Sequence, residues 1–177
     1  MEDSHNNLIN LCKKGDRKAQ TQLYAVFYKK VYNSCYRMLQ SQYEAEDAMQ
    51  ESFIKAFSRL DKYDGETPFE AWILRIAINT AIDKLRENQP EWVDYDEKHF
   101  HYPEAEDETE AWELTLEKTQ QIKAAIEQLP DTARIIINLY LIEGYDHEEI
   151  SGILHISAGN ARIQYMRAKQ KLIEMLK

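Results

Sequence analysis

The C-terminal part of the sequence holds side chains that suit contacts with nucleic acid. The stretch EEISGILHISAGNARIQYMRAKQKL, residues 148–172, indicates a short helix, a tight turn and a second helix rich in Arg, Lys, Gln and Asn. Amide side chains can bond adenine edges, Arg can bond guanine or phosphate, and Lys suits phosphate. The pattern is typical of a helix-turn-helix unit, whose second helix enters the major groove. The side chains predicted to face DNA are Asn160, Arg162, Gln164, Arg167, Lys169 and Lys171.

The same helix has an apolar face that must pack on the helices before it. The members of this face recur at helical spacing and are Ala161, Tyr165, Ala168, Leu172 and Leu176. Ser151 supplies a small residue where the first helix of such a unit crosses the second. His155 stands in the turn, where glycine is usual because the backbone there is left-handed. A solvated polar face is the alternative interpretation of the polar residues, since every surface helix has one.

A second polar stripe is predicted in the N-terminal half, on a helix that starts near residue 69. Its members recur at helical spacing and are Trp72, Arg75, Asn79, Asp83 and Arg86, with Lys84 beside them. Arg side chains can hold phosphates, and Asn79 can bond a base edge. The loop DGETPF before this helix offers backbone donors, Thr67 and Phe69. Trp72 suits a core position as well as it suits stacking on a base, and Phe69 is expected in the core.

No catalytic constellation is found among the side chains of the sequence. There is no nucleophile and base pattern and no glycine-rich loop that could cradle a phosphate, so we expect neither enzyme activity nor a cofactor. His99 and His101, with Asp94 and Asp96, are the candidate metal ligands. A flexible acidic segment would not preorganise them, so no metal site is expected.

The elements that would position the polar stripes are helices. Gly and Pro are scarce, at 5 and 4 of 177 residues. Apolar residues recur at helical spacing in two further stripes, Ala19, Leu23, Phe27, Val31 and Cys35, then Ala45, Met49, Phe53, Ala56 and Leu60. Residues 1–87 hold 13 acidic and 13 basic side chains, residues 119–177 hold 7 of each, and residues 88–118 hold 11 and 2, which is the whole net charge of −9. We therefore predict two neutral helical modules joined by an acidic linker.

The sequence also indicates a protein of a reducing compartment that does not span a membrane. Cys12 and Cys35 lie in apolar helical patterns and are predicted to be buried free thiols. No apolar run reaches the length of a membrane span, and the N-terminus has no signal of basic and then apolar residues. We expect a cytoplasmic protein without direct membrane insertion.

Together the two modules resemble the extracytoplasmic-function (ECF) sigma factors, small bacterial transcription initiation factors. Residues 44–87, EAEDAMQESFIKAFSRLDKYDGETPFEAWILRIAINTAIDKLRE, are similar to their region 2. Residues 126–172, IEQLPDTARIIINLYLIEGYDHEEISGILHISAGNARIQYMRAKQKL, are similar to their region 4. The resemblance implies an all-α fold of two small helical domains. These would be a region 2 bundle at 1–87, an acidic linker at 88–118 and a four-helix region 4 domain with the helix-turn-helix at 119–177.

The resemblance implies a factor that binds core RNA polymerase and directs promoter-specific transcription initiation. Region 2 would dock on a coiled coil of the largest polymerase subunit and would open the minus-ten element, and region 4 would read the minus-thirty-five element. The loop before residue 69 would accept a flipped base of the non-template strand. The residues implied for polymerase docking are Asp47, Gln50, Glu51 and Ile54, which would otherwise be a solvated helix face. Those implied for minus-ten DNA are Asp64, Gly65, Thr67, Trp72, Arg75, Asn79, Asp83, Lys84 and Arg86.

The linker is implied to run toward the active-site channel of the polymerase. That channel is basic because it holds nucleic acid, so we hypothesise that the charge of residues 88–118 imitates the polyanion that growing RNA later replaces. A solubilising spacer is the alternative. Family members are commonly controlled by an anti-sigma factor, which would be a further partner and could hold the protein near the membrane.

Two other classes of protein compete with this interpretation. A one-component helix-turn-helix repressor would bind duplex DNA alone as a symmetric dimer, but it has no need of the W…RIA.N.AID..R helix. An all-helical metal-dependent hydrolase would use the carboxylates of residues 94–108.

Overall fold

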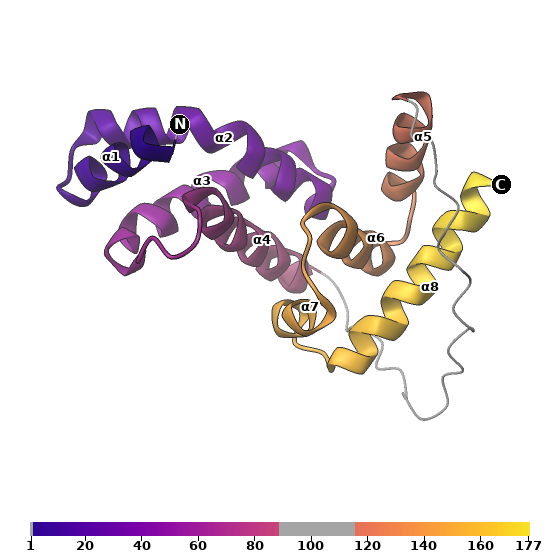
Figure 1. Cartoon of the computed structure of the whole chain (residues 1–177). Coiled ribbons are helices and arrows are strands. Elements are labelled where there is room, and N and C mark those ends of the chain that lie inside the picture. The colour runs from indigo at the N-terminus through magenta and orange to yellow at the C-terminus, as the bar shows by residue number, and fades with distance from the viewer. Residues whose placement is uncertain (1, 89–115) are drawn as a thin grey trace. The chain divides into compact units, whose positions relative to one another are not determined.

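The computed structural model describes residues 2–88 and 116–177 (Figure 1). These residues form helices and no strand, which confirms the all-α expectation. The chain divides into two compact units, Met1–Gln89 and Pro90–Lys177. The functional boundaries expected at residues 87 and 119 stay a prediction.

Most of the acidic linker lies outside the described residues. The candidate metal ligands of the linker, and the hypothesis that its charge imitates nucleic acid, therefore also fall outside them. Among the described helices, none has both the length and the apolar character that crossing a membrane requires.

The N-terminal unit is a bundle in which α2, α3 and α4 pack on one another, while α1 packs on α2 and on a short 3₁₀ turn, η1 (Figure 1). Asp16 starts α2 because its Oδ1 accepts the backbone N–H groups of Lys18, at 2.8 Å, and Ala19, at 3.1 Å. Ser41 caps α3 in the same way. The elements are α1 (Glu2–Lys13), α2 (Arg17–Leu39), α3 (Gln42–Ser58), η1 (Leu60–Lys62) and α4 (Phe69–Asn88).

The core of this unit is built from the apolar stripes that the sequence predicts. Every member of the two stripes in residues 19–60 is buried, and α4 adds Ile73, Ala77, Ile78, Ala81 and Ile82. Cys12 and Cys35 are buried free thiols, as predicted. Full burial of one large apolar side chain contributes roughly 1.5–3 kcal/mol, so the inner faces hold the bundle together and the outer faces are left for polar contacts.

The C-terminal unit places α8 against α5, α6 and α7. The predicted helix, turn and helix are present as α7, a turn at His155 and α8. His155 has φ 55° and ψ 44°, the left-handed conformation expected at this turn. Asp146 and Glu149 form a capping box at the start of α7, and Ser157 caps α8. The elements are α5 (Leu116–Glu127), α6 (Asp131–Ile137), η3 (Asn138–Ile142, a turn of π-helix), α7 (His147–Leu154) and α8 (Ala158–Leu176).

Candidate functional site

One face of α3 is exposed and carries acidic residues beside apolar ones. Ile54 is 68% exposed, Asp47 and Gln50 are exposed, and Glu51 is half-buried. This face, which we call the α3 face, therefore presents all four residues implied for polymerase docking. It also contains Tyr43, which is 82% exposed and lies one helical turn before Asp47. The sequence interpretation missed Tyr43, although its spacing from Asp47 places both on the same side of the helix.

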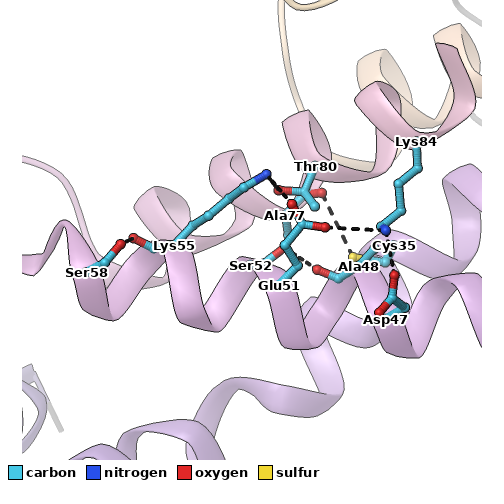
Figure 2. A network of polar contacts seen from close by, with 10 residues as sticks. All are labelled: Cys35, Asp47, Ala48, Glu51, Ser52, Lys55, Ser58, Ala77, Thr80 and Lys84. Atoms are coloured by element: carbon cyan, nitrogen blue, oxygen red, sulfur yellow. Dashed lines mark hydrogen bonds and ion pairs between the residues drawn. The ribbon is translucent and has the colours of Figure 1, made fainter. Parts of the chain in front are cut away.

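The α3 face is tied to α4 by a row of polar contacts (Figure 2). Lys84 Nζ of α4 lies 2.5 Å from Asp47 Oδ2 and 3.3 Å from Glu51 Oε2. Glu51 Oε1 lies 2.7 Å from Lys55 Nζ, which also donates to Thr80 Oγ1 at 3.2 Å. The bond to Asp47, followed by that to Glu51, raises the pKa of Lys84 above its ordinary value. The bonds from Lys55 and then Lys84 lower the pKa of Glu51, so Glu51 and Lys84 are charged at neutral pH.

The outward stripe of α4 holds three of the predicted minus-ten residues. Arg75, Asn79 and Asp83 are exposed on it. Arg86 is half-buried, and its Nη1 lies 3.5 Å from Asp83 Oδ1. Lys84 is also half-buried and reaches toward α3 instead of along this stripe. Arg75 and Asn79 are therefore the best placed of the stripe for a phosphate and a base edge.

An aromatic cluster supports the start of α4. Tyr63 and Phe69 are buried at 6% and 5% exposure, and Trp72 is half-buried. The Trp72 ring lies 5.3 Å from that of Tyr63 and 5.5 Å from that of Phe69, centroid to centroid. Phe69 is thus a core residue, as expected. Trp72 packs in this cluster but is only half-buried, and its predicted role in stacking on a base stays a prediction.

Residues 64–68 form an exposed loop whose two ends are fastened by Tyr63. Tyr63 Oη donates to the carbonyl of Thr67 at 2.7 Å, and Lys13 Nζ of α1 donates to the carbonyl of Tyr63 at 2.8 Å. Within the loop, Asp64 Oδ1 accepts the backbone N–H two residues later at 2.9 Å, and Gly65 has φ 85°. We call these residues the minus-ten loop, after the role that the sequence resemblance implies for them. Its predicted members Asp64, Gly65 and Thr67 are all exposed.

The predicted outward orientation of Asn160 and Gln164 on α8 is wrong. Their exposure is 1% and 7%, and Gln164 Nε2 donates to Asn160 Oδ1 at 3.2 Å. The buried arc of α8 is wider than its apolar stripe, because α5, α6 and α7 all pack against this helix. Two amide side chains one turn apart can be buried on this face because they hydrogen-bond to each other.

A partly exposed stripe of α8, which we call the exposed stripe, runs instead through Arg162, Met166 and Lys169. Arg162 is exposed, and Met166 and Lys169 are half-buried. Arg167 and Lys171 are exposed on another side of the helix. The sequence interpretation missed Met166 because only polar side chains were considered for contacts with DNA. Its position one turn after Arg162 places both residues on the same side of the helix. The predicted apolar face is confirmed, since Ala161, Ala168 and Leu172 are buried and Tyr165 and Leu176 are half-buried.

Three rings brace α8 against the preceding elements. The His147 ring stacks on that of Tyr140 at 4.8 Å and lies 5.4 Å from that of Tyr165. The rings of Tyr140 and Tyr165 are 4.2 Å apart. Burial, and then the charge of Arg162, lowers the pKa of His147, while Asp146 opposes this shift. The lowered pKa favours the neutral imidazole, whose contacts with Tyr140 and Tyr165 are part of the packing of α8.

Comparison with known proteins accounts for both units. Residues 23–91 match the family model of Sigma-70 region 2, and residues 119–172 match that of Sigma-70, region 4. The chain is 33% identical to the ECF RNA polymerase sigma factor SigW of Bacillus subtilis (strain 168), with 96% of this chain and 95% of that protein covered. The chain belongs to the ECF sigma factors. This sigma factor is also 32% identical to the ECF RNA polymerase sigma-E factor of Escherichia coli (strain K12), with 93% and 90% of the two chains covered.

Solved structures share the fold of the sigma factor. One is the sigma factor RpoE in complex with the anti-sigma factor NepR from Bartonella quintana, with a TM-score of 0.55, 20% identity and 88% and 95% of the two chains covered. Another is CnrH in complex with the cytosolic domain of CnrY, with a TM-score of 0.54, 22% identity and 96% and 94% covered.

Membership of the family establishes what the protein does. The sigma factor directs promoter-specific transcription initiation by RNA polymerase. The region 2 match begins at residue 23, so α1 and the start of α2 lie outside it. Lys13, which bonds to the base of the minus-ten loop, comes from this part of the chain.

Proposed function

We propose that three exposed surfaces divide the work of the sigma factor. The α3 face docks on core RNA polymerase, the minus-ten loop and the outward stripe of α4 take up minus-ten DNA, and the exposed stripe of α8 reads the minus-thirty-five element. The observation that carries this division is that the three surfaces differ in the types of side chain that they present to solvent. The α3 face presents acidic and apolar side chains, whereas α4 presents Arg75 and Asn79 beside Asp83, and α8 presents Arg162 and Lys169 beside Met166.

The α3 face suits a partner helix that carries Arg beside apolar residues. Asp47 and Glu51 can accept charge-assisted bonds from such a helix, which are about twice as strong as neutral ones. Ile54 and Tyr43 flank these acids and can fill apolar pockets at the centre of the contact. The coiled coil of the largest polymerase subunit, which the family resemblance implies, is the partner we assign to this face.

The minus-ten loop suits an unstacked base. Its residues are exposed, Asp64 and Thr67 among them, and its ends are fastened. A flipped base can therefore bond to these side chains while the loop loses little further conformational freedom. Arg75 and Asn79 follow on α4 and can hold the adjacent backbone and a base edge. The exposed part of Trp72 offers a surface for stacking.

The exposed stripe of α8 suits the major groove. Arg162 can bond guanine O6 and N7, and Met166 can contact a thymine methyl group. Lys169, together with Arg167 and Lys171, is placed for phosphates. Because Asn160 and Gln164 are buried, we assign them to the packing of α8 and not to base readout.

Further partners and the location of the protein follow from the family. We propose control by an anti-sigma factor, because RpoE, which shares the fold, was solved with the anti-sigma factor NepR. We also propose that the sigma factor acts in the cytoplasm, where promoters and polymerase are found. The polymerase would perform all of the chemistry, and the sigma factor would supply binding and strand opening.

One experiment tests the division as a whole. Transcription is reconstituted with purified core RNA polymerase on a promoter library randomised in both elements, and the transcribed templates are sequenced. We expect transcription to depend on core and the selected bases to fall into two separate blocks. Tight specific binding of duplex DNA by the sigma factor alone would contradict the proposal and would favour a repressor.

A further inference from the structure

The minus-ten loop is held by residues that lie far from it in sequence. Lys13 at the end of α1 donates from Nζ to the carbonyl of Tyr63 at 2.8 Å across 50 residues. The same ammonium group lies 5.8 Å from the centre of the Tyr63 ring. Tyr63 Oη then donates to the carbonyl of Thr67 at 2.7 Å. One side chain from outside the region 2 match is thus connected to both ends of the loop.

We propose that Lys13 and Tyr63 are positioning residues that set the conformation of the minus-ten loop and so control how strongly it discriminates among bases. This inference rests on the proposed function of the loop. It adds α1 to the promoter-reading part of the protein. Neither residue needs to touch DNA, because both act through the backbone of residues 63–67.

The physical reason is the conformational freedom of an exposed loop. Fixing the backbone of one residue costs roughly 1–2 kcal/mol, so an untied loop of five residues would adopt many conformations. Gly65, with φ 85°, adds to this freedom. Selection of one base over another requires donors held within roughly 0.5 Å of their productive positions. The bonds of Tyr63 at the two ends of the loop, and that of Lys13 to Tyr63, supply this restraint.

A purely structural role for Lys13 is less consistent with its surroundings. α1 is held in the bundle by Ile9 and Cys12, which are buried at 3% and 4% exposure. Lys13 itself is exposed, so replacing it uncovers no core. Lys14 is also exposed and follows directly after the last residue of α1, so both cations lie near the negative end of the helix dipole. Lys14 therefore serves as a matched control for the loss of charge.

The test measures base preference position by position in the full-length protein. Holoenzymes made with Lys13→Met, Tyr63→Phe, Lys13→Arg and the control Lys14→Met are used on the promoter library, and Thr67→Ala identifies the positions that the loop reads. Thr67→Ala keeps the backbone carbonyl that Tyr63 binds. Affinity for core polymerase and preference at the minus-thirty-five element are measured in parallel.

We expect Lys13→Met and Tyr63→Phe each to lower base preference at the loop's positions by about two- to tenfold, the range that corresponds to the loss of one hydrogen bond. Lys13→Arg should restore part of the preference, because Arg can still donate to the Tyr63 carbonyl. Core affinity, preference at the minus-thirty-five element and all values for Lys14→Met should match those of the wild type.

Four results would overturn the inference. Equal base preferences for Lys13→Met and Lys14→Met would show that the bond from Lys13 to the Tyr63 carbonyl does not control base preference. A uniform loss of transcription on every promoter would show that Lys13 only supports the fold. If Thr67→Ala alters no minus-ten position, the loop does not read bases, and the proposed function of the loop fails together with the inference. If Thr67→Ala changes base preference and Lys13→Met does not, the inference is overturned but the proposed function of the loop stands.

Discussion

Lys84 Nζ on α4 and Asp47 Oδ2 on α3 lie 2.5 Å apart, and this ion pair helps to join the helix proposed to bind promoter DNA to the helix proposed to bind polymerase (Figure 2). The Asp47 side chain is 57% exposed in this pair. Exposed pairs contribute only about 0.2–1 kcal/mol, so the buried apolar residues, and not this pair, hold α3 against α4. A cation supplied by the polymerase could therefore replace Lys84 at Asp47 without loss of the fold.

Reversing the charge of Asp47 should damage polymerase binding selectively. We expect Asp47→Lys to weaken affinity for core polymerase at least about tenfold, because a cation would then oppose the basic partner helix. The measurement is a fluorescence anisotropy titration of the labelled sigma factor with core polymerase. Glu127→Lys is the control, since it changes net charge equally at an exposed position of α5. Equal losses in the two variants would indicate a nonspecific charge effect and would argue against docking through the α3 face.

The exposed stripe and the buried amides of α8 should respond differently to substitution. Arg162→Ala or Met166→Ala should lower base preference in the minus-thirty-five element by about 1–3 kcal/mol at the bases that each side chain contacts. The free energy of unfolding should change little, because Arg162 is exposed and Met166 is only half-buried. Library transcription and urea unfolding measure the two quantities.

Gln164→Ala is the matched comparison. It leaves the side-chain oxygen of the buried Asn160 without the bond from Gln164, so we expect a loss of about 1–3 kcal/mol in the free energy of unfolding. Base preference among templates should be retained by the folded protein. A change in base preference with unaltered stability would return Gln164 to the reading surface.

The apolar periodicity of the sequence predicts the helices and their inner faces well. The stripes through Leu23, Val31, Met49 and Phe53 are buried because period and hydrophobicity are local properties that one helix displays by itself. The cap at Asp16 and the left-handed turn at His155 are local as well.

The features that the sequence does not predict are contacts between elements. Asn160 and Gln164 are polar, so their types indicate exposure, but the neighbours of α8 cover them. The types of Lys13 and Tyr63 give no sign of a bond between residues 50 positions apart. The reach of Lys84 toward Asp47 likewise depends on how α3 and α4 pack. The burial and the bonding partners of these side chains depend on how the helices pack on one another. The periodicity of a single sequence contains no information about that packing.

Acid should destabilise the C-terminal unit through His147. Burial lowers the pKa of His147 below its ordinary value of 6.5, so below about pH 6.5 the unfolded chain binds more protons at this site than the folded chain. The contribution of His147 to the free energy of unfolding is therefore fully present above this pH and is lost as the pH is lowered toward the pKa of the folded state. Urea unfolding of His147→Phe, which keeps a ring beside Tyr140, should show a smaller loss of stability between pH 7.5 and 5 than the wild type does. Equal losses would contradict the prediction.

Arg75 should contribute to promoter binding through a phosphate. It is exposed on α4, so Arg75→Ala should weaken holoenzyme binding to every promoter to a similar degree and should reduce the salt slope of log affinity by about 1. The measurement is holoenzyme affinity for one strong and one weak promoter at several salt concentrations. Arg59→Ala is the control, because Arg59 is also an exposed arginine of the N-terminal unit but lies at the end of α3. A slope that Arg75→Ala leaves unchanged would remove Arg75 from the DNA surface, whereas a loss confined to one promoter would assign it to a base.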